Sequence, residues 1–160
     1  MNSDAPTARC DRYLEDYRPG ESHDCGSVTV TEEEIVEFAT RFDPQFFHVD
    51  PEAAADGPFG GLIASGWHTT ALMMRLYADH YLSPAASLGG PGVDELRWTA
   101  PVRPGDTLRL RVTVLEARPS RSKPDRGILR SRVEMTNQRQ ETVLRLTVLN
   151  MLRVRPADSG

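Results

Sequence analysis

The sequence predicts an α+β fold, a curved antiparallel β-sheet wrapped around one long central helix. Three observations predict it. The helical stretches precede a run of four strands, whereas a parallel sheet requires strands and helices to alternate along the chain. These strands span about 9–12 residues against a usual length of about 5–6, and long antiparallel strands curl. The last helix before them is apolar over most of its circumference, which is typical of a helix enclosed by other elements.

The amino-terminal part of the chain predicts one strand and one helix. We expect residues 1–20 to form a flexible segment, followed by a single domain over residues 21–156. Residues His23–Val30 alternate weakly between apolar and polar side chains, which predicts a short first strand. The sequence Thr31-Glu-Glu-Glu34 then predicts a capping box at the start of a helix. The apolar side chains of this helix recur at helical spacing, at Ile35, Phe38, Ala39 and Phe42.

Two further helices are expected before the strands begin. Pro44 ends the first helix, because proline cannot continue it. A short helix then starts with Asp50 as its N-cap and Pro51 in its first position. Residues Ser65–Leu82 form the long central helix, and the glycine-rich segment 83–92 is a loop.

The rest of the chain predicts four consecutive strands. Clean alternation of apolar and polar side chains marks most of them, and a polar turn at Asn137–Gln140 joins the last two. Arginine and threonine rows should face solvent, and open sheet edges favour pairing with a second copy. We therefore expect a homodimer or a higher homo-oligomer. The predicted strands are Val93–Ala100, Asp106–Glu116, Ile128–Thr136 and Val143–Val154.

Composition and charge exclude several classes of protein. Hydrophobic residues make up 39% and charged residues 26%, which is ordinary for a soluble globular domain. The net charge of −4 argues against a nucleic-acid partner. The longest stretch without Asp, Glu, Lys or Arg, residues 57–74, is too polar for a membrane, and residues 1–20 lack the apolar core of a signal peptide. Cys10 and Cys25 match no zinc spacing, so we expect free thiols, a cytoplasmic location and no metal or other cofactor.

One short segment, Asp43-Pro-Gln-Phe-Phe-His48, combines a carboxylate with an imidazole. Pro44 keeps this connection out of the preceding helix, so both side chains can turn toward one point. Such a pair can hold one water molecule, with one group taking a proton and the other donating one. The spacing alone leaves a structural alternative open, in which Asp43 caps the next turn and His48 is a half-buried histidine with satisfied hydrogen bonds.

Small residues lie directly before the long helix and in its first turn. The start of a helix presents unpaired N–H groups and a positive dipole end, so we expect the Gly66 N–H to be an oxyanion donor. Gly60 and Gly61 fit close packing between chain segments equally well. Ser65 and His68 lie three residues apart, but no G-x-S-x-G elbow surrounds Ser65, and we do not expect a nucleophilic serine.

These segments resemble motifs of the MaoC-like (R)-specific enoyl-CoA hydratases. Asp43-Pro-Gln-Phe-Phe-His48 is similar to the family motif D-x-N-P-[LIV]-H, and Pro58-Phe-Gly-Gly-Leu-Ile-Ala-Ser-Gly-Trp67 to its P-[IV]-x-H-G-M stretch. Residues 91–98 resemble a strand of the family, and Pro101-Val-Arg-Pro-Gly-Asp106 its P-V-x-x-G-D turn. The resemblance extends over residues 31–154 and implies a hot-dog fold.

The resemblance also implies an enzyme, a hydro-lyase of fatty acid metabolism. It would hydrate trans-2-enoyl thioesters with (R) specificity, or dehydrate (3R)-hydroxyacyl thioesters, carried by CoA or by an acyl carrier protein. Asp43 and His48 would activate the water, and the Gly66 amide would polarise the thioester carbonyl. Bulky pocket walls favour a short or shaped acyl group. The substrate-binding residues are expected to be Phe47, Phe59, Leu62, Ser65 and Trp67.

The sequence departs from the family motifs at three positions. Gln45 stands where Asn is usual, Phe46 where Pro is usual, and Ser65 where His is usual before the glycine. Two alternatives are therefore kept beside the hydratase. A hot-dog acyl-thioesterase would attack the carbonyl rather than C3, but it does not need the Asp-x4-His segment. The departures at Gln45 and Phe46 keep open a non-catalytic dimer that binds acyl thioesters.

Overall fold

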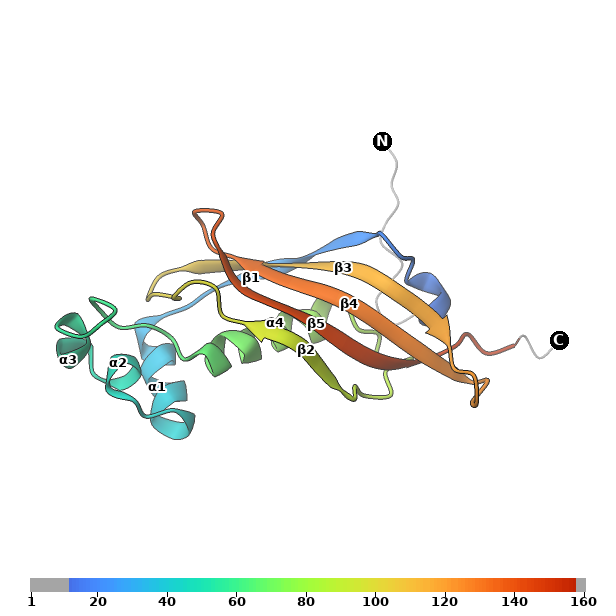
Figure 1. Cartoon of the computed structure of the whole chain (residues 1–160), viewed down its shortest axis with the longest axis horizontal. Coiled ribbons are helices and arrows are strands. Elements are labelled where there is room, and N and C mark those ends of the chain that lie inside the picture. The colour runs from blue at the N-terminus through green and yellow to red at the C-terminus, as the bar shows by residue number, and fades with distance from the viewer. Residues whose placement is uncertain (1–11, 158–160) are drawn as a thin grey trace.

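Residues 12–157 are described by the structure, which is a computed structural model. Five antiparallel strands form one sheet in the order β1-β3-β4-β5-β2, and the sheet curves around helix α4 (Figure 1). This arrangement confirms the α+β class and the hot-dog architecture. In chain order the elements are η2 (Leu14–Asp16), β1 (Ser22–Thr29), α1 (Glu32–Phe42), α2 (Phe46–Val49), α3 (Pro51–Ala55), α4 (Gly66–His80), β2 (Gly92–Arg97), β3 (Thr107–Pro119), β4 (Arg126–Thr136) and β5 (Thr142–Arg153).

The helix starts follow the capping residues that the sequence indicates. The Thr31 hydroxyl accepts the Glu34 N–H at 3.2 Å at the start of α1. Asp50 accepts the Ala53 N–H at 3.1 Å at the start of α3, with proline in the first position as expected. Each cap satisfies a backbone donor that has no partner inside its helix, at a worth of about 1 kcal/mol. The chain direction at these points is therefore set locally.

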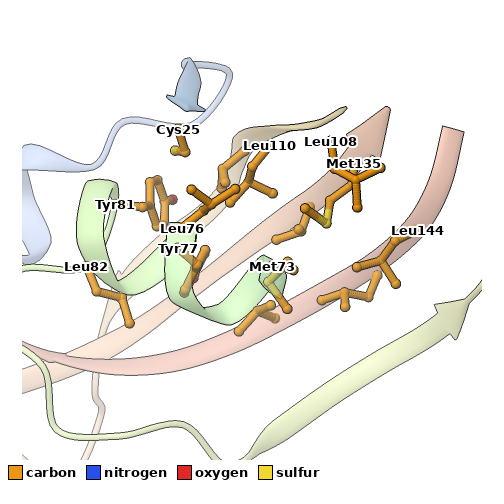
Figure 2. Packing of buried hydrophobic residues seen from close by; sticks show 14 of the residues in the cluster. Cys25, Met73, Leu76, Tyr77, Tyr81, Leu82, Leu108, Leu110, Met135 and Leu144 are labelled. Atoms are coloured by element: carbon orange, nitrogen blue, oxygen red, sulfur yellow. The ribbon is translucent and has the colours of Figure 1, made fainter. Parts of the chain in front are cut away.

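The core lies between α4 and the concave face of the sheet (Figure 2). Alternate residues of β3, β4 and β5 point inward, which the strands' alternating hydrophobicity predicts. Burial of each large apolar side chain stabilises the fold by about 1.5–3 kcal/mol. Figure 2 shows the central part of this core, with Met73, Leu76 and Tyr77 from α4, Tyr81 directly after it, and Leu108, Leu110, Met135 and Leu144 from the strands.

Part of the segment expected to be flexible packs against the domain. Within residues 12–20, Leu14 and Tyr17 are buried in the core. The Tyr17 hydroxyl donates a hydrogen bond to the Tyr81 carbonyl at 2.6 Å, which ties this segment to the end of α4. The sequence before Arg12 lies outside the described residues.

Cys25 is a free thiol, buried on β1, and burial raises its pKa to about 11. Cys10 lies outside the described residues. Within residues 12–157, no helix is long and apolar enough to span a membrane. The same part of the chain contains no group of three or more His, Cys, Asp or Glu side chains arranged to hold a metal ion.

A single chain encloses α4 on one side only. Trp67 and Met74 leave 58% and 45% of their surface exposed on the side that turns away from the sheet. Strand β2 is one of the two edge strands, and Val93 on it and Trp98 just after it are also about half exposed. The exposed Trp67 and Trp98 rings contact each other edge-on, with centroids 5.1 Å apart, which joins the start of α4 to the end of β2.

Helices α1, α2 and α3 gather at one end of the sheet, beside the start of α4 (Figure 1). Helix α1 packs against α2, and α2 against α3. A turn just before α4 adds to this end, where Gly60 has a φ of +65°, a left-handed conformation that glycine adopts without strain. This end of the molecule carries the residues that the sequence singles out.

Candidate active site

Asp43 and His48 come from two successive helices. Asp43 is the residue at which α1 ends, and its N–H donates to the Ala39 carbonyl at 2.8 Å. The chain then leaves the helix through Pro44 and Gln45 and forms α2, which carries His48. Pro44 keeps the connection out of α1 as expected, but the short helix α2 that follows was not predicted, because proline prevents helical structure only around its own position.

His48 is almost completely buried and has a defined tautomer. Its Nδ1 lies 2.7 Å from the carbonyl oxygen of Ile63. A carbonyl can only accept a hydrogen bond, so Nδ1 carries a proton and Nε2 of the neutral ring carries a lone pair. The Ile63 N–H in turn donates to the Phe47 carbonyl at 3.0 Å. This hydrogen bond fixes the position of Ile63, whose own carbonyl orients the His48 ring.

The Asp43 carboxylate accepts a hydrogen bond at each oxygen. Gln45 Nε2 donates to Oδ1, and Ser65 Oγ donates to Oδ2, both at 2.7 Å. The His48 Nε2 lies 3.4 Å from Oδ2. Burial acts to raise the pKa of Asp43, but the two hydrogen bonds and the charge of a protonated His48 outweigh it and hold the pKa below its ordinary value. The carboxylate is therefore ionised at neutral pH.

Gly66 begins α4 next to this pair. Its N–H has no acceptor among the described residues, as expected for the first position of a helix. A side chain at this position would collide with Trp98, since a Cβ would lie 2.3 Å from Cδ2 of the indole. The indole N–H donates to Thr70 Oγ1 at 3.0 Å, so Trp98 is held over the start of the helix.

Asp43, His48 and Gly66 all line one cavity of about 460 Å³. Of the expected substrate-binding residues, Phe47, Phe59 and Trp67 line it too, with the Phe47 ring packed edge-on against Phe59 and His48. Its other walls are mostly apolar or weakly polar. The remaining lining residues are Gln45, Ile63, Ala64, Thr69, Trp98, Thr99, Ala100, Pro101, Val102 and Val143.

Two of the expected substrate-binding residues lie behind the cavity wall. Leu62 is 6% exposed and belongs to the hydrophobic core. Ser65 is fully buried, and its hydroxyl bonds to Asp43. The structure does not form a Ser65–His68 pair, because the His68 ring instead stacks on Phe38 at 4.7 Å.

Trp98 is the largest of the lining residues that the sequence did not indicate. It follows β2 and reaches Gly66 only because the sheet brings the end of β2 over the start of α4. No local pattern indicates this contact. The one local sign that another group approaches closely is Gly66, the glycine at the start of the apolar helix. From the sequence it was expected to serve as an oxyanion donor.

Comparison with protein families matches residues 16–137 to the MaoC-like domain. The chain belongs to the MaoC-like domain family. A MaoC-like dehydratase from Rhodospirillum rubrum has a similar structure, with a TM-score of 0.84 and 43% sequence identity, over 91% of this chain and 99% of that one. Some relatives in this family are named as dehydratases, whereas others carry names that state no such activity.

Two relatives add detail to the family assignment. An uncharacterized protein from Bacillus subtilis, YdeM, is 33% identical over 81% of this MaoC-like chain and 91% of its own length. The 3-hydroxyacyl-thioester dehydratase Z of Mycobacterium tuberculosis is 44% identical over 51% of this chain and 56% of its own length. The second match therefore covers about half of each protein.

Proposed function

We propose that this MaoC-like protein hydrates trans-2-enoyl thioesters with (R) specificity and catalyses the reverse dehydration of (3R)-hydroxyacyl thioesters. One observation carries the proposal. Asp43 Oδ2 and His48 Nε2 lie 3.4 Å apart and line the same apolar cavity as the free Gly66 N–H. Two acceptors and one fixed donor on one cavity are the groups that addition of water to a conjugated thioester requires.

In the hydration direction, His48 is the general base. Its Nε2 takes a proton from water while the water oxygen bonds to C3 of the enoyl group. Asp43 stays ionised, accepts a hydrogen bond from the second O–H of the water and stabilises the imidazolium that forms. General acid–base catalysis of this kind contributes about 10²–10⁴-fold to a rate.

The electrons of the C2–C3 double bond move onto the thioester oxygen and form an enolate. The Gly66 N–H at the positive end of α4 stabilises this oxyanion, and a donor of this kind is worth about 10²–10³-fold in kcat. The enolate then collapses, and C2 takes the proton from the imidazolium of His48. Water has been added across the double bond, and both side chains return to their starting states.

The walls of the cavity favour a short or shaped acyl group. Phe47, Phe59, Trp67 and Trp98 surround it with aromatic rings. The thioester carrier is CoA or an acyl carrier protein, and the relative named as a 3-hydroxyacyl-thioester dehydratase supports this substrate class. Such intermediates belong to fatty acid metabolism, and the free thiol of Cys25 supports a reducing, cytoplasmic compartment.

A homodimer would cover the apolar surface of α4. Trp67 and Met74 are exposed on α4, and β2 is an open edge strand that presents unpaired backbone groups to a second copy. Pairing of two β2 strands would extend the sheet and bury Val93 and Trp98. Trp67 and Trp98 also line the cavity, so the second copy would complete its mouth.

Incubation with crotonyl-CoA tests the proposal. The expected product is (R)-3-hydroxybutyryl-CoA, identified by chiral chromatography, with no release of the CoA thiol. Free thiol in place of the hydroxyacyl product would support the thioesterase alternative. Binding of crotonyl-CoA and of longer enoyl-CoA substrates without turnover would support the non-catalytic alternative and contradict the proposal.

A further inference from the structure

The hydroxyl of Ser65 makes two hydrogen bonds, one to the proposed catalytic carboxylate and one to the start of α4. Its Oγ donates to Asp43 Oδ2 at 2.7 Å and accepts the Trp67 N–H at 3.3 Å. The second bond makes Ser65 the N-cap of α4, directly before Gly66. One buried hydroxyl therefore connects the carboxylate to the end of the helix that carries the free N–H.

We propose that Ser65 is a positioning residue for Asp43, holding the carboxylate beside His48 in fixed register with the Gly66 N–H. The inference extends the proposed function. It rests on that function because the position of Asp43 relative to the Gly66 N–H matters only when both groups act on one substrate. From the sequence, Ser65 was expected to bind substrate, and the inference assigns it a different role.

The geometry excludes the two other roles for this serine. A nucleophilic serine must reach the substrate and needs a strong base, whereas the Ser65 hydroxyl is fully buried and donates to Asp43, a weak base because its pKa is lowered. The nearby His68 stacks on Phe38, and its Nδ1 has no partner among the described residues. A substrate-binding role needs contact with the cavity, whereas Ser65 is 0% exposed and lies behind its wall.

The hydrogen bond has an electrostatic consequence for the pair. A carboxylate that accepts hydrogen bonds favours its charged form, and Ser65 is the largest cause that lowers the pKa of Asp43. Loss of the Ser65 hydroxyl removes this stabilisation while burial still opposes the charge. The pKa of Asp43 then rises, and the side chain loses the contact that fixes its rotamer beside His48.

Ser65→Ala tests the inference, with Ser83→Ala as the matched control. Ser83 lies just beyond the other end of α4, is also 0% exposed, and its Oγ has no hydrogen-bond partner among the described residues. The two variants therefore remove the same atom from equally buried sites, and only one of them touches Asp43. Ser65→Gly is a second variant, because glycine is nearly as good an N-cap as serine and avoids loss of the helix start.

Two readouts are needed. The first is the titration of the Asp43 carboxyl carbon by ¹³C NMR, assigned from its loss in Asp43→Asn. The second is the steady-state hydration of crotonyl-CoA by the full chain. In Ser65→Ala and Ser65→Gly we expect the Asp43 titration to move to higher pH and kcat to fall by about 100-fold with little change in KM. Ser83→Ala should move neither.

An unshifted Asp43 titration in a folded Ser65 variant would overturn the inference. A higher KM at unchanged kcat, with the titration unmoved, would assign Ser65 to substrate binding and overturn it as well. The titration requires no turnover, so the two proposals can fail separately. A wild-type protein that is inactive on enoyl thioesters contradicts the proposed function, whereas the Asp43 titration still decides whether Ser65 positions the carboxylate.

Discussion

Helix α4 has a polar cluster at each end. The two clusters differ in how completely their polar groups are hydrogen-bonded and in whether they lie beside a cavity. The amino-terminal cluster consists of Asp43, His48, Ser65 and Gly66. The carboxyl-terminal cluster consists of Tyr17, Tyr77, Tyr81, Ser131 and Asn150. Both contain several hydrogen bonds below 3 Å, so hydrogen bonding alone does not separate a site from a structural network.

In the carboxyl-terminal cluster every phenol hydroxyl has a protein partner. Tyr77 donates to Asn150 Oδ1, and Tyr81 shares a hydrogen bond of 2.7 Å with Ser131. Both tyrosines are 0% exposed, and burial raises their pKa, so they remain neutral. This cluster is closed and uncharged.

The amino-terminal cluster lies beside a cavity, and its polar groups are incompletely hydrogen-bonded. The Gly66 N–H has no hydrogen-bond partner among the described residues, His48 Nε2 meets only the Asp43 carboxylate at 3.4 Å, and Asp43 is held charged. Polar groups that a fold leaves incompletely paired at a cavity indicate a site, whereas fully paired buried groups indicate structure. The following predictions test this distinction, from the largest expected effect to the smallest.

Removal of either member of the proposed catalytic pair should have the largest effect. Asp43→Asn and His48→Ala should each lower kcat/KM for crotonyl-CoA by about 10²–10⁴-fold, because proton transfer loses its base or its orienting charge. Steady-state assays measure the loss, and circular dichroism confirms that the variants are folded. Full activity of either folded variant contradicts the role of that residue.

Tyr77→Phe tests the opposite cluster. The change leaves Asn150 Oδ1 buried without a donor and should lower the free energy of unfolding by about 1–3 kcal/mol. Urea denaturation measures this loss. We expect kcat/KM to stay within a factor of about two, because the tyrosine lies outside the cavity lining. A large fall in activity at unchanged stability would show that this cluster is not purely structural.

Gly66→Ala tests the contact between α4 and Trp98. Glycine-to-alanine changes usually stabilise by about 0.4–1 kcal/mol where the backbone permits them. Here the new methyl group would meet the indole ring, so we expect destabilisation by about 1–3 kcal/mol instead. Chemical denaturation of Gly66→Ala, Trp98→Ala and the double variant measures the coupling. If the double variant is no more stable than additivity predicts, the contact is not the cause.

The pH dependence of stability gives the smallest effect. The folded pKa of Asp43 lies below its ordinary value of 3.8, so its charge stabilises the fold at pH values above 3.8. This contribution should be lost as the pH falls through the lowered folded pKa. Urea denaturation of the wild type and Asp43→Asn should give a stability difference that is constant near neutral pH and shrinks only in strong acid. A difference that changes around neutral pH would contradict the pKa direction.

Most of the fold could be predicted because its signals are local. The capping residues Thr31 and Asp50 and the alternation in β3, β4 and β5 each act within a few positions of the chain. The ends of elements were less predictable, since β2 ends at Arg97 rather than Ala100, after its register against β5 shifts between Asp94 and Arg97. Such a shift depends on the partner strand and leaves no mark in the sequence of β2.

The site could be predicted in part. Asp43, His48 and Gly66 were singled out, and the structure brings them to one cavity. The contact of Gln45 with Asp43 was not foreseen, because it depends on how the chain leaves α1. Trp98 was missed for a similar reason, as it is far from Gly66 in sequence and near it only in the fold.

Hydration of crotonyl-CoA in deuterium oxide tests the central claim most directly, that the amino-terminal cluster adds water to an enoyl thioester. Mass spectrometry and chiral chromatography of the product should show one deuterium at C2 and an (R)-hydroxyl at C3. The reaction should be lost in the double variant Asp43→Asn/His48→Ala and retained in Tyr77→Phe. Labelled product formed at the wild-type rate by the folded double variant would contradict the account.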